Sequence, residues 1–193
     1  MKEIQEQYFK NDTQWRNWLH ENHTQKEGIY LIFYAVSHKK ESMRWEEAVR
    51  VALCYGWIDS TVKNIGVGKR RQYFCPRKTK SVWSKVNKDH LKELAADGLL
   101  HQSGLQVIKA AKKNGSWTAL DAVEKGIIPE DLQLAFDKNP LAFKNYNGLT
   151  RGQRKSYLYW LNQAKRKATQ EKRIGEIIAL CEQNIKSRDN GWG

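Results

Sequence analysis

The chain has 193 residues, of which 40% are hydrophobic, so it is long and apolar enough to bury a core. A protein that is disordered over its whole length is therefore excluded. It carries 34 lysines and arginines against 21 acidic residues, a net charge of +13. No apolar run is long enough to span a bilayer, the amino terminus has no secretory signal, and three scattered cysteines form no disulfide framework. We therefore expect a cytoplasmic protein that does not span a membrane.

The positive charge is concentrated in two segments. Residues 61–90 carry a net charge of +8 and residues 151–193 a net charge of +6, while the rest of the chain is close to neutral. Such blocks indicate localised positive surfaces rather than a diffuse excess.

The first predicted helix follows two N-cap residue types, Asp12 and Thr13, and ends before Gly28. Its apolar face carries Trp15, Trp18 and Leu19. Residues 28–35 form a short run of β-branched and aromatic side chains, which is typical of a buried strand.

A second predicted helix begins after Ser42 and ends at Gly56. Its apolar stripe, at helical spacing, consists of Trp45, Ala48, Val49, Ala52 and Leu53. Residues 57–65 and 70–75 then read as two strands joined by a glycine-rich turn. We expect these two strands to form a hairpin with residues 28–35 beside it.

The chain becomes helical after residue 85. N-cap residue types precede four predicted helices, at Asn87, Ser103, Ser116 and Thr150. Two prolines, Pro129 and Pro140, stand at favoured helix starts. The last helix is predicted by the stripe of Ile174, Ile177, Ile178 and Cys181.

These elements predict an α+β fold that is mainly helical. We expect residues 1–86 to contain a small three-stranded antiparallel sheet, and residues 87–186 to form a helical part packed on it as one compact unit. Residues 187–193 are predicted to be a frayed tail.

The segment from Trp57 to Asn87 holds the densest group of candidate site residues. Asp59 in a strand near Arg77 is a candidate base or substrate anchor, and an ordinary structural hydrogen bond or ion pair is the alternative. The candidate ligand-binding residues are Trp57, Asp59, Arg77, Lys78, Ser81, Trp83, Ser84 and Asn87. The alternative is that Trp83 belongs to the core, and that Ser81 and Asn87 are helix caps.

Basic residues interleaved with aromatic residues also favour binding of a polyanion, because cations bind phosphates and aromatic rings stack on bases. The predicted polyanion surface consists of Lys69, Arg70, Arg71, Lys80, Arg151, Arg154, Lys155 and Lys165. The alternative is that these charges are plain solvated faces.

The sequence predicts no metal, no cofactor and no defined reaction. His20 and His23 share a helix face but lack a third ligand at suitable spacing. Cys75 has cationic neighbours that lower a thiol pKa, but no histidine is adjacent in sequence. The glycine-rich turn at residues 66–69 lacks the spacing of a phosphate-binding loop.

Three motifs resemble the bacteriocin-protection, YdeI or OmpD-associated family. They are ALCYGWID at residues 52–59, FCPR at 74–77 and SVWSKVN at 81–87, and the similarity extends over residues 15–185. Further residues follow one another in the same order as in that family. They are Gly98, Gly104, Ala110, Ala111, Trp117, the segment 129–132 and the last pair of helices. The turn at 66–69 departs from the family, because many relatives carry acidic residues there.

The resemblance implies a protective role under stress and brings no agreed reaction. The family is sometimes described as periplasmic, whereas this chain shows no export signal. Three functions stay open. They are binding of nucleic acid or another phosphate-bearing ligand, a small-molecule enzyme or binding protein with a pocket around Asp59, Arg77 and Trp83, and a protein–protein interaction module without chemistry.

Overall fold

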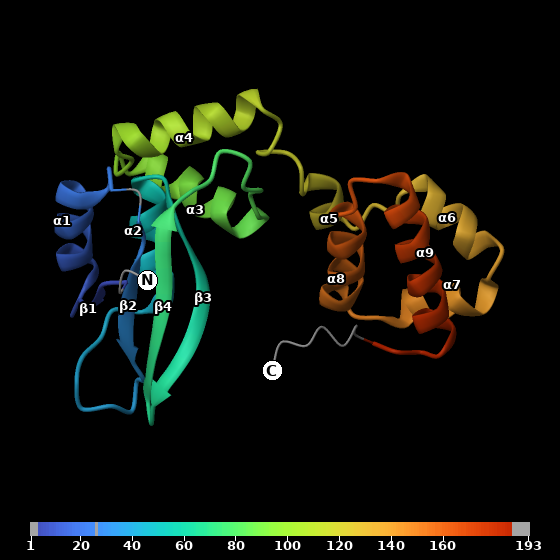
Figure 1. Cartoon of the computed structure of the whole chain (residues 1–193), viewed down its shortest axis with the longest axis horizontal. Helices are drawn as coiled ribbons and strands as arrows, with labels where there is room; N and C mark the ends of the chain where they lie inside the picture. Colours follow the sequence, from blue (N-terminus) through green and yellow to red (C-terminus); the bar gives the residue numbers. More distant parts are fainter. Residues whose placement is uncertain (1–3, 26, 187–193) are drawn as a thin grey trace. The chain divides into compact units, whose positions relative to one another are not determined.

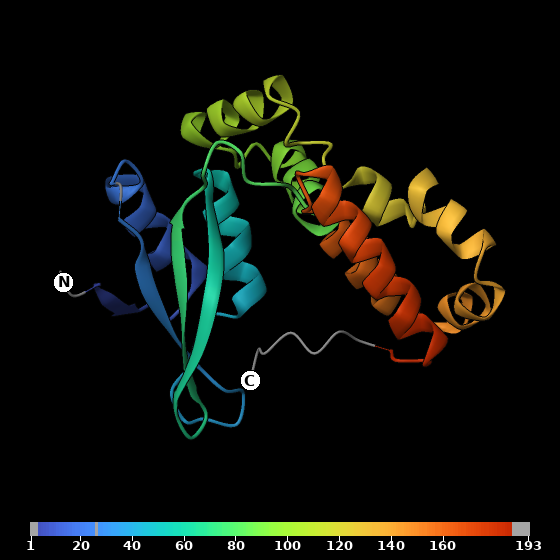
Figure 2. The same cartoon turned by 45° about the vertical axis from the view of Figure 1, so that its right-hand side comes forward.

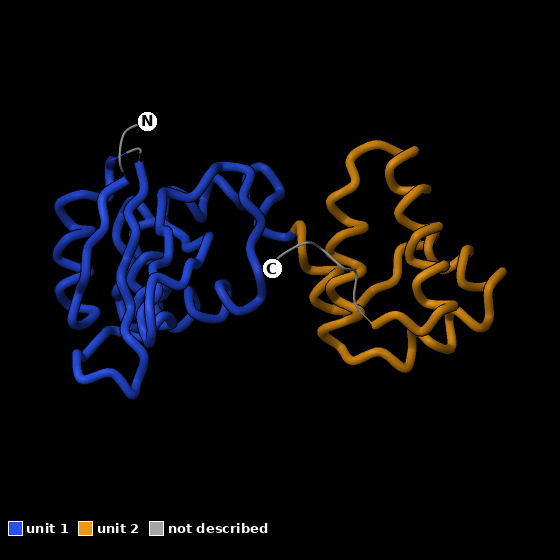
Figure 3. The backbone as a smooth tube through the Cα atoms, turned by 60° about the horizontal axis from the view of Figure 1, so that its bottom comes forward, with its two compact units in different colours: residues 1–118 blue, residues 119–193 orange. Residues whose placement is uncertain are grey.

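The structure is a computed structural model that describes residues 4–25 and 27–186. The chain divides into two compact units, residues 1–118 (unit 1) and residues 119–193 (unit 2), which Figure 3 shows in different colours. The predicted frayed tail, residues 187–193, lies outside the described residues. Among the described residues, no helix is both long and apolar enough to cross a membrane.

Unit 1 contains a four-stranded mixed sheet in the order β1-β2-β4-β3 (Figure 1). The strands are β1 (Glu6–Tyr8), β2 (Ile29–Tyr34), β3 (Trp57–Gly66) and β4 (Lys69–Pro76). The α+β class is confirmed, with about 52% of the chain helical.

The predicted three-stranded antiparallel sheet is wrong in detail, because β1 adds a fourth strand parallel to β2. This strand has only three residues, and its sequence EQY alternates too briefly to be recognised. The free edge of β2 supplies its hydrogen-bonding partners, so tertiary pairing makes the strand.

The predicted β3–β4 hairpin is confirmed, with Trp57 opposite Pro76 at its open end. At its tip Gly66 and Gly68 have positive φ angles of 145° and 63°, which only glycine adopts without strain. Strand β2 pairs with β4, as expected from the sequence.

Two helices, α1 (Asp12–Asn22) and α2 (Trp45–Cys54), pack their apolar stripes against the sheet, except that Trp45 of the predicted α2 stripe is exposed. The Trp15 ring on α1 lies 5.8 Å from the Phe74 ring of β4, and its Nε1 donates to the Ala48 carbonyl of α2. Trp15 and Phe74 are fully buried, so this contact lies at the centre of the unit 1 core.

Unit 1 is completed by α3 (Lys85–Ala96) and α4 (Gln102–Lys113). Gly104 of α4 lies so close to α2 that an added Cβ would be 2.2 Å from the Cys54 carbonyl oxygen. These two helices therefore belong to unit 1, which ends at residue 118.

Several helix caps differ from prediction by one to three residues. The observed N-caps are Asn11, Arg44, Ser84 and His101, in place of Asp12 or Thr13, Ser42, Asn87 and Ser103. Ser42 instead accepts a hydrogen bond from the Tyr34 amide. Neighbouring polar residues compete for the cap, and contacts outside the helix decide between them.

Unit 2 is a bundle of five described helices. They are α5 (Asp121–Lys125), α6 (Glu130–Asp137), α7 (Pro140–Gly148), α8 (Arg151–Asn162) and α9 (Lys167–Glu182). Thr150 caps α8 as predicted, and Gln153 completes a reciprocal capping box. The helix expected at Ser116 begins instead at Asp121, after a turn.

Candidate functional site

The two tryptophans of the predicted pocket are core residues. Trp57 and Trp83 are each 1% exposed. The Trp57 Nε1 donates to the His23 carbonyl, and the Trp83 ring packs against Trp117. Neither indole is therefore open to a ligand.

Asp59 lies on the side of β3 that faces α2. Its Oδ2 accepts hydrogen bonds from the Trp45 Nε1 at 2.9 Å and from the Gln72 Nε2 at 2.5 Å. Gln72 is buried, so the carboxylate satisfies a polar group inside the fold. The observed contacts of Asp59 are those of a structural acceptor that also fixes the orientation of the Trp45 indole.

Arg77 does not hydrogen-bond to Asp59 among the described residues. Its Nη2 donates to the Val82 carbonyl, and its guanidinium lies 3.7 Å from the centre of the Trp83 ring. Burial lowers the pKa of Arg77 to about 10, and the negative charge of Asp59 opposes that change. Arg77 therefore remains protonated at neutral pH and acts mainly in packing.

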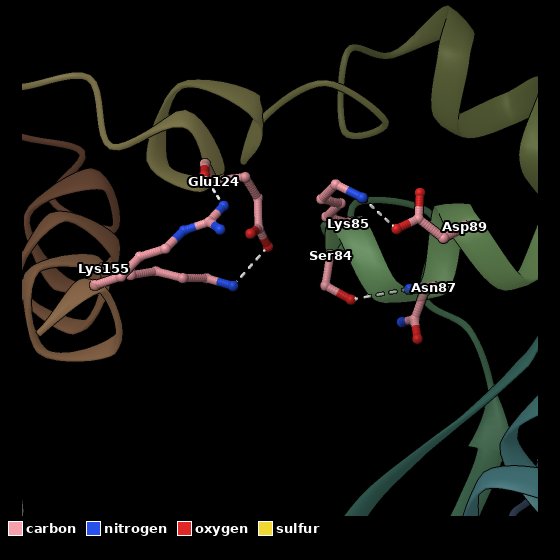
Figure 4. Close-up of polar contacts among 7 residues, drawn as sticks. Ser84, Lys85, Asn87, Asp89, Glu124 and Lys155 are labelled. Atoms are coloured by element: carbon pink, nitrogen blue, oxygen red, sulfur yellow. Dashed lines mark hydrogen bonds and ion pairs between the residues drawn. The ribbon is translucent and has the colours of Figure 1, made fainter.

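The remaining predicted ligand residues lie in the loop after β4 and in the first turn of α3. The Ser84 hydroxyl accepts from the Asn87 amide, which is the N-cap contact drawn in Figure 4. Lys78 and Lys80 are exposed, and the Ser81 amide closes a turn on the Lys78 carbonyl. These contacts define a capped helix start beside exposed cations.

Burial has a larger effect on the Cys75 thiol than its cationic neighbours have. Burial raises its pKa, and this outweighs the lowering by Lys78 and Arg77. A raised pKa leaves little thiolate at neutral pH, so Cys75 is a poor nucleophile.

The side chains of the first basic segment, residues 61–90, lie on two different faces of the sheet because neighbouring residues of a strand point to opposite sides. On β2, Ile29, Leu31 and Phe33 are buried, while Tyr30, Ile32 and Tyr34 are partly exposed. Cross-strand pairs share a face, and Tyr30 pairs with Tyr73. The same face includes Tyr8 of β1, whose ring lies 5.5 Å from Tyr34. We call the surface formed by Tyr8, Tyr30, Tyr34 and Tyr73 the tyrosine face.

Cations lie among these four rings. Arg71 is 4.5 Å from the Tyr30 ring, and Lys40 is 3.9 Å from Tyr8 and 5.1 Å from Tyr34. Lys69 pairs with Tyr34 across the strands, and Lys63 pairs with Arg71. Arg70 lies on the opposite face, near the Phe33 ring. Aromatic and positive groups therefore lie together on the tyrosine face, where Arg71 also forms an ion pair with Glu6 of β1.

A cavity of about 530 Å³ lies at the hairpin end of the sheet. The loop after β2 and the tip of the β3–β4 hairpin lie side by side there (Figure 2). Its wall includes three cations, Arg44, Lys69 and Arg70, together with the indole of Trp45, which is 42% exposed. Tyr34 and Lys69 belong both to this wall and to the tyrosine face.

The second basic segment belongs to unit 2. Arg151, Arg154 and Lys155 lie on α8, and Lys165 is exposed between α8 and α9. Lys155 forms an ion pair with Glu124 at 2.7 Å, shown in Figure 4. The two basic segments therefore lie in different units.

The sequence pattern did not predict the four tyrosines of the tyrosine face as site residues. The alternation of Tyr30 and Tyr34 with fully apolar residues was the available signal, but the whole run reads as a buried strand. Only the pairing with Tyr73 and Tyr8 shows that a second, more polar face exists.

Three histidine rings gather near Tyr55 in unit 1. His101 lies 4.7 Å from His23 and 5.8 Å from His20, measured between ring centres. No group of three His, Cys, Asp or Glu side chains in the described part of the chain is arranged to hold a metal ion.

Two family models match the chain. The model described as Domain of unknown function (DUF8412) matches residues 7–107, and the model of the bacteriocin-protection, YdeI or OmpD-associated family matches residues 125–184. The recognition of the latter family is thus confirmed for the C-terminal part, whereas the three motifs at residues 52–87 lie within the first match. No curated protein and no solved structure matches the chain. Residues 125–184 match the bacteriocin-protection, YdeI or OmpD-associated model, and the chain belongs to the DUF8412 family, whose model covers just over half of its length.

Proposed function

We propose that this protein binds single-stranded nucleic acid on the tyrosine face of unit 1. The observation that carries the proposal is the set of four tyrosine rings on one side of the sheet, with lysine and arginine side chains between them. Proteins that bind single strands without strong sequence preference combine aromatic rings, on which bases stack, with cations that bind phosphates. A sheet holds both at fixed spacing because its side chains alternate between faces.

The cavity at the hairpin end supports the same function. Phe33 and Arg70 of the cavity wall lie on the opposite face of the sheet, whereas Tyr34 and Lys69 border both surfaces, so a strand would reach the cavity from the tyrosine face by passing around the hairpin end. Its volume of about 530 Å³ is in the range of small-ligand pockets, which is about 300–1,000 Å³. A terminal base would stack on the exposed Trp45 indole, and Arg44 and Arg70 would neutralise its phosphate.

The test is a fluorescence anisotropy titration of labelled oligouridylate and oligothymidylate with the full chain, over a series of salt concentrations. Wild type should bind more weakly as salt rises, because counterions released from the phosphates drive the binding. Lys69→Ala should reduce the slope of log affinity against log salt by about 0.7, the value for one phosphate contact on a single strand. Tyr34→Leu should weaken binding about 5-fold or more and leave the slope unchanged, because stacking contributes about 1–3 kcal/mol per base.

Matched controls are Lys92→Ala on α3 and Tyr159→Leu on α8, both at exposed helical positions that do not belong to the tyrosine face or the cavity. Both should bind like wild type. Binding that ignores salt, or equal losses in control and test variants, would contradict the proposal.

The cavity alone favours a second candidate, which is a small anionic aromatic ligand such as a mononucleotide. Three cations and an exposed indole around one cavity suit a phosphate and a base. Competition separates the two candidates. A mononucleotide that displaces the oligonucleotide completely at similar concentration favours the cavity, and weak or partial displacement favours the extended tyrosine face.

A further inference from the structure

Unit 2 holds a second, separate pocket on the first turns of α8. Its volume is about 310 Å³, and it is enclosed by the end of α5, the end of α7 and the start of α8. Its wall carries four cations against one carboxylate, that of Glu124. The cations are Lys125, Arg151, Arg154 and Lys155.

The cations are held in place by contacts to the wall itself. Arg151 donates to the Glu124 carbonyl at 3.2 Å, and Arg154 donates to the Asn147 carbonyl at 3.4 Å. A guanidinium has five N–H donors, so each arginine keeps donors for a ligand. The start of α8 adds the partial positive charge of a helix N-terminus.

Tyr146 provides an independent indication of a ligand. This residue lines the pocket, is 1% exposed, and its hydroxyl has no hydrogen-bond partner among the described residues. Burial raises the pKa of Tyr146 to about 12, and the positive charge of Arg154 opposes this rise. A buried hydroxyl without a partner is rare in folded proteins and is costly unless something else satisfies it.

We propose that this pocket binds the phosphate group of a small phosphate monoester, with Arg151, Arg154 and Lys155 neutralising its charge and the Tyr146 hydroxyl donating a hydrogen bond to it. Phosphate suits the site because it carries two negative charges and several acceptor oxygens. Arginine forks match its geometry, and the neutral phenol supplies a donor that remains protonated at neutral pH. The Glu124–Lys155 ion pair, at 2.7 Å, holds the ammonium at the rim of the pocket.

The test is calorimetric titration of the full chain with inorganic phosphate and with phenyl phosphate, at ionic strength held constant with sodium chloride. Wild type should bind both. Tyr146→Phe and Arg154→Gln should each weaken binding by about 10-fold or more, the effect of one lost hydrogen bond to a charged group. The controls Lys144→Ala on α7 and Tyr159→Phe on α8 remove a similar charge and a similar hydroxyl outside the pocket, and should bind like wild type.

Folding is checked in the same variants. Because the Tyr146 hydroxyl has no partner in the described residues, Tyr146→Phe should resist urea at least as well as wild type in the absence of ligand. A variant that is as stable as wild type yet binds phosphate weakly would support the proposal. No binding by wild type, or equal affinity of wild type and Tyr146→Phe, would overturn it. Weaker phosphate binding by Tyr146→Phe assigns the site to unit 2, because the pocket that Tyr146 lines shares no residue with the cavity of unit 1.

Discussion

Replacing Gly104 with alanine should destabilise unit 1 although alanine favours helices. The added Cβ would lie 2.2 Å from the Cys54 carbonyl oxygen, where ordinary contact starts at 3.4 Å, so α4 must move away from α2 by about 1 Å. The obstacle is backbone and cannot rotate away. Overpacking costs about 1–3 kcal/mol, and the gain in helix propensity is about 1 kcal/mol. The difference is a net loss of about 0–2 kcal/mol, and we expect the upper half of this range, about 1–2 kcal/mol, because both helix backbones are fixed.

The matched control is Gly175→Ala in α9, where an added Cβ meets nothing within 4 Å. This substitution should stabilise unit 2 by about 0.5–1 kcal/mol, because it only reduces the freedom of the unfolded chain. Six of the eight tryptophans lie in unit 1, so urea unfolding followed by tryptophan fluorescence reports on that unit. Hydrogen exchange of the α9 amides reports on unit 2. A Gly104→Ala protein as stable as wild type would refute the close approach of α4 to α2.

Three further predictions concern unit 1 and the buried thiols. Asp59→Ala should lower the free energy of unfolding by about 1–3 kcal/mol, measured in urea, because a buried amide and the Trp45 indole lose their acceptor. Burial and two neighbouring imidazoles lower the pKa of His101 below its usual 6.5. As the pH falls, the unfolded chain therefore takes up a proton on His101 at about pH 6.5, before the folded protein does. Stability is full above pH 6.5 and falls as the pH drops through 6.5 toward the lowered pKa. His101→Asn should flatten this fall, measured as the unfolding midpoint against pH. With a thiol reagent at mildly alkaline pH, half-buried Cys75 should react before Cys181, whose pKa burial raises to about 11; equal rates would contradict this burial pattern.

Local sequence determined most elements, because helix stripes, strand runs and turn glycines act over a few residues. The stripe that includes Trp15 and Leu19, the turn between β3 and β4, and the Thr150 cap all appear where the sequence predicts them. The caps at Ser84 and His101 were displaced because several capping side chains lie close together in the chain. Contacts outside the helix select among them.

The candidate site depended much more on tertiary structure. Sequence pointed to the basic residues of the first segment, but an indole such as Trp57 or Trp83 reads the same whether it faces a ligand or the core. Pairing of β1, β2 and β4 decides which side chains share a face, and so creates the tyrosine face. In unit 2 the pocket that Tyr146 lines exists only because α5, α7 and α8 come together, and its hydroxyl has no hydrogen-bond partner in the part of the chain that the structure describes. Local patterns follow from the chain's own geometry, whereas a surface that binds requires residues distant in sequence, and only packing brings these together.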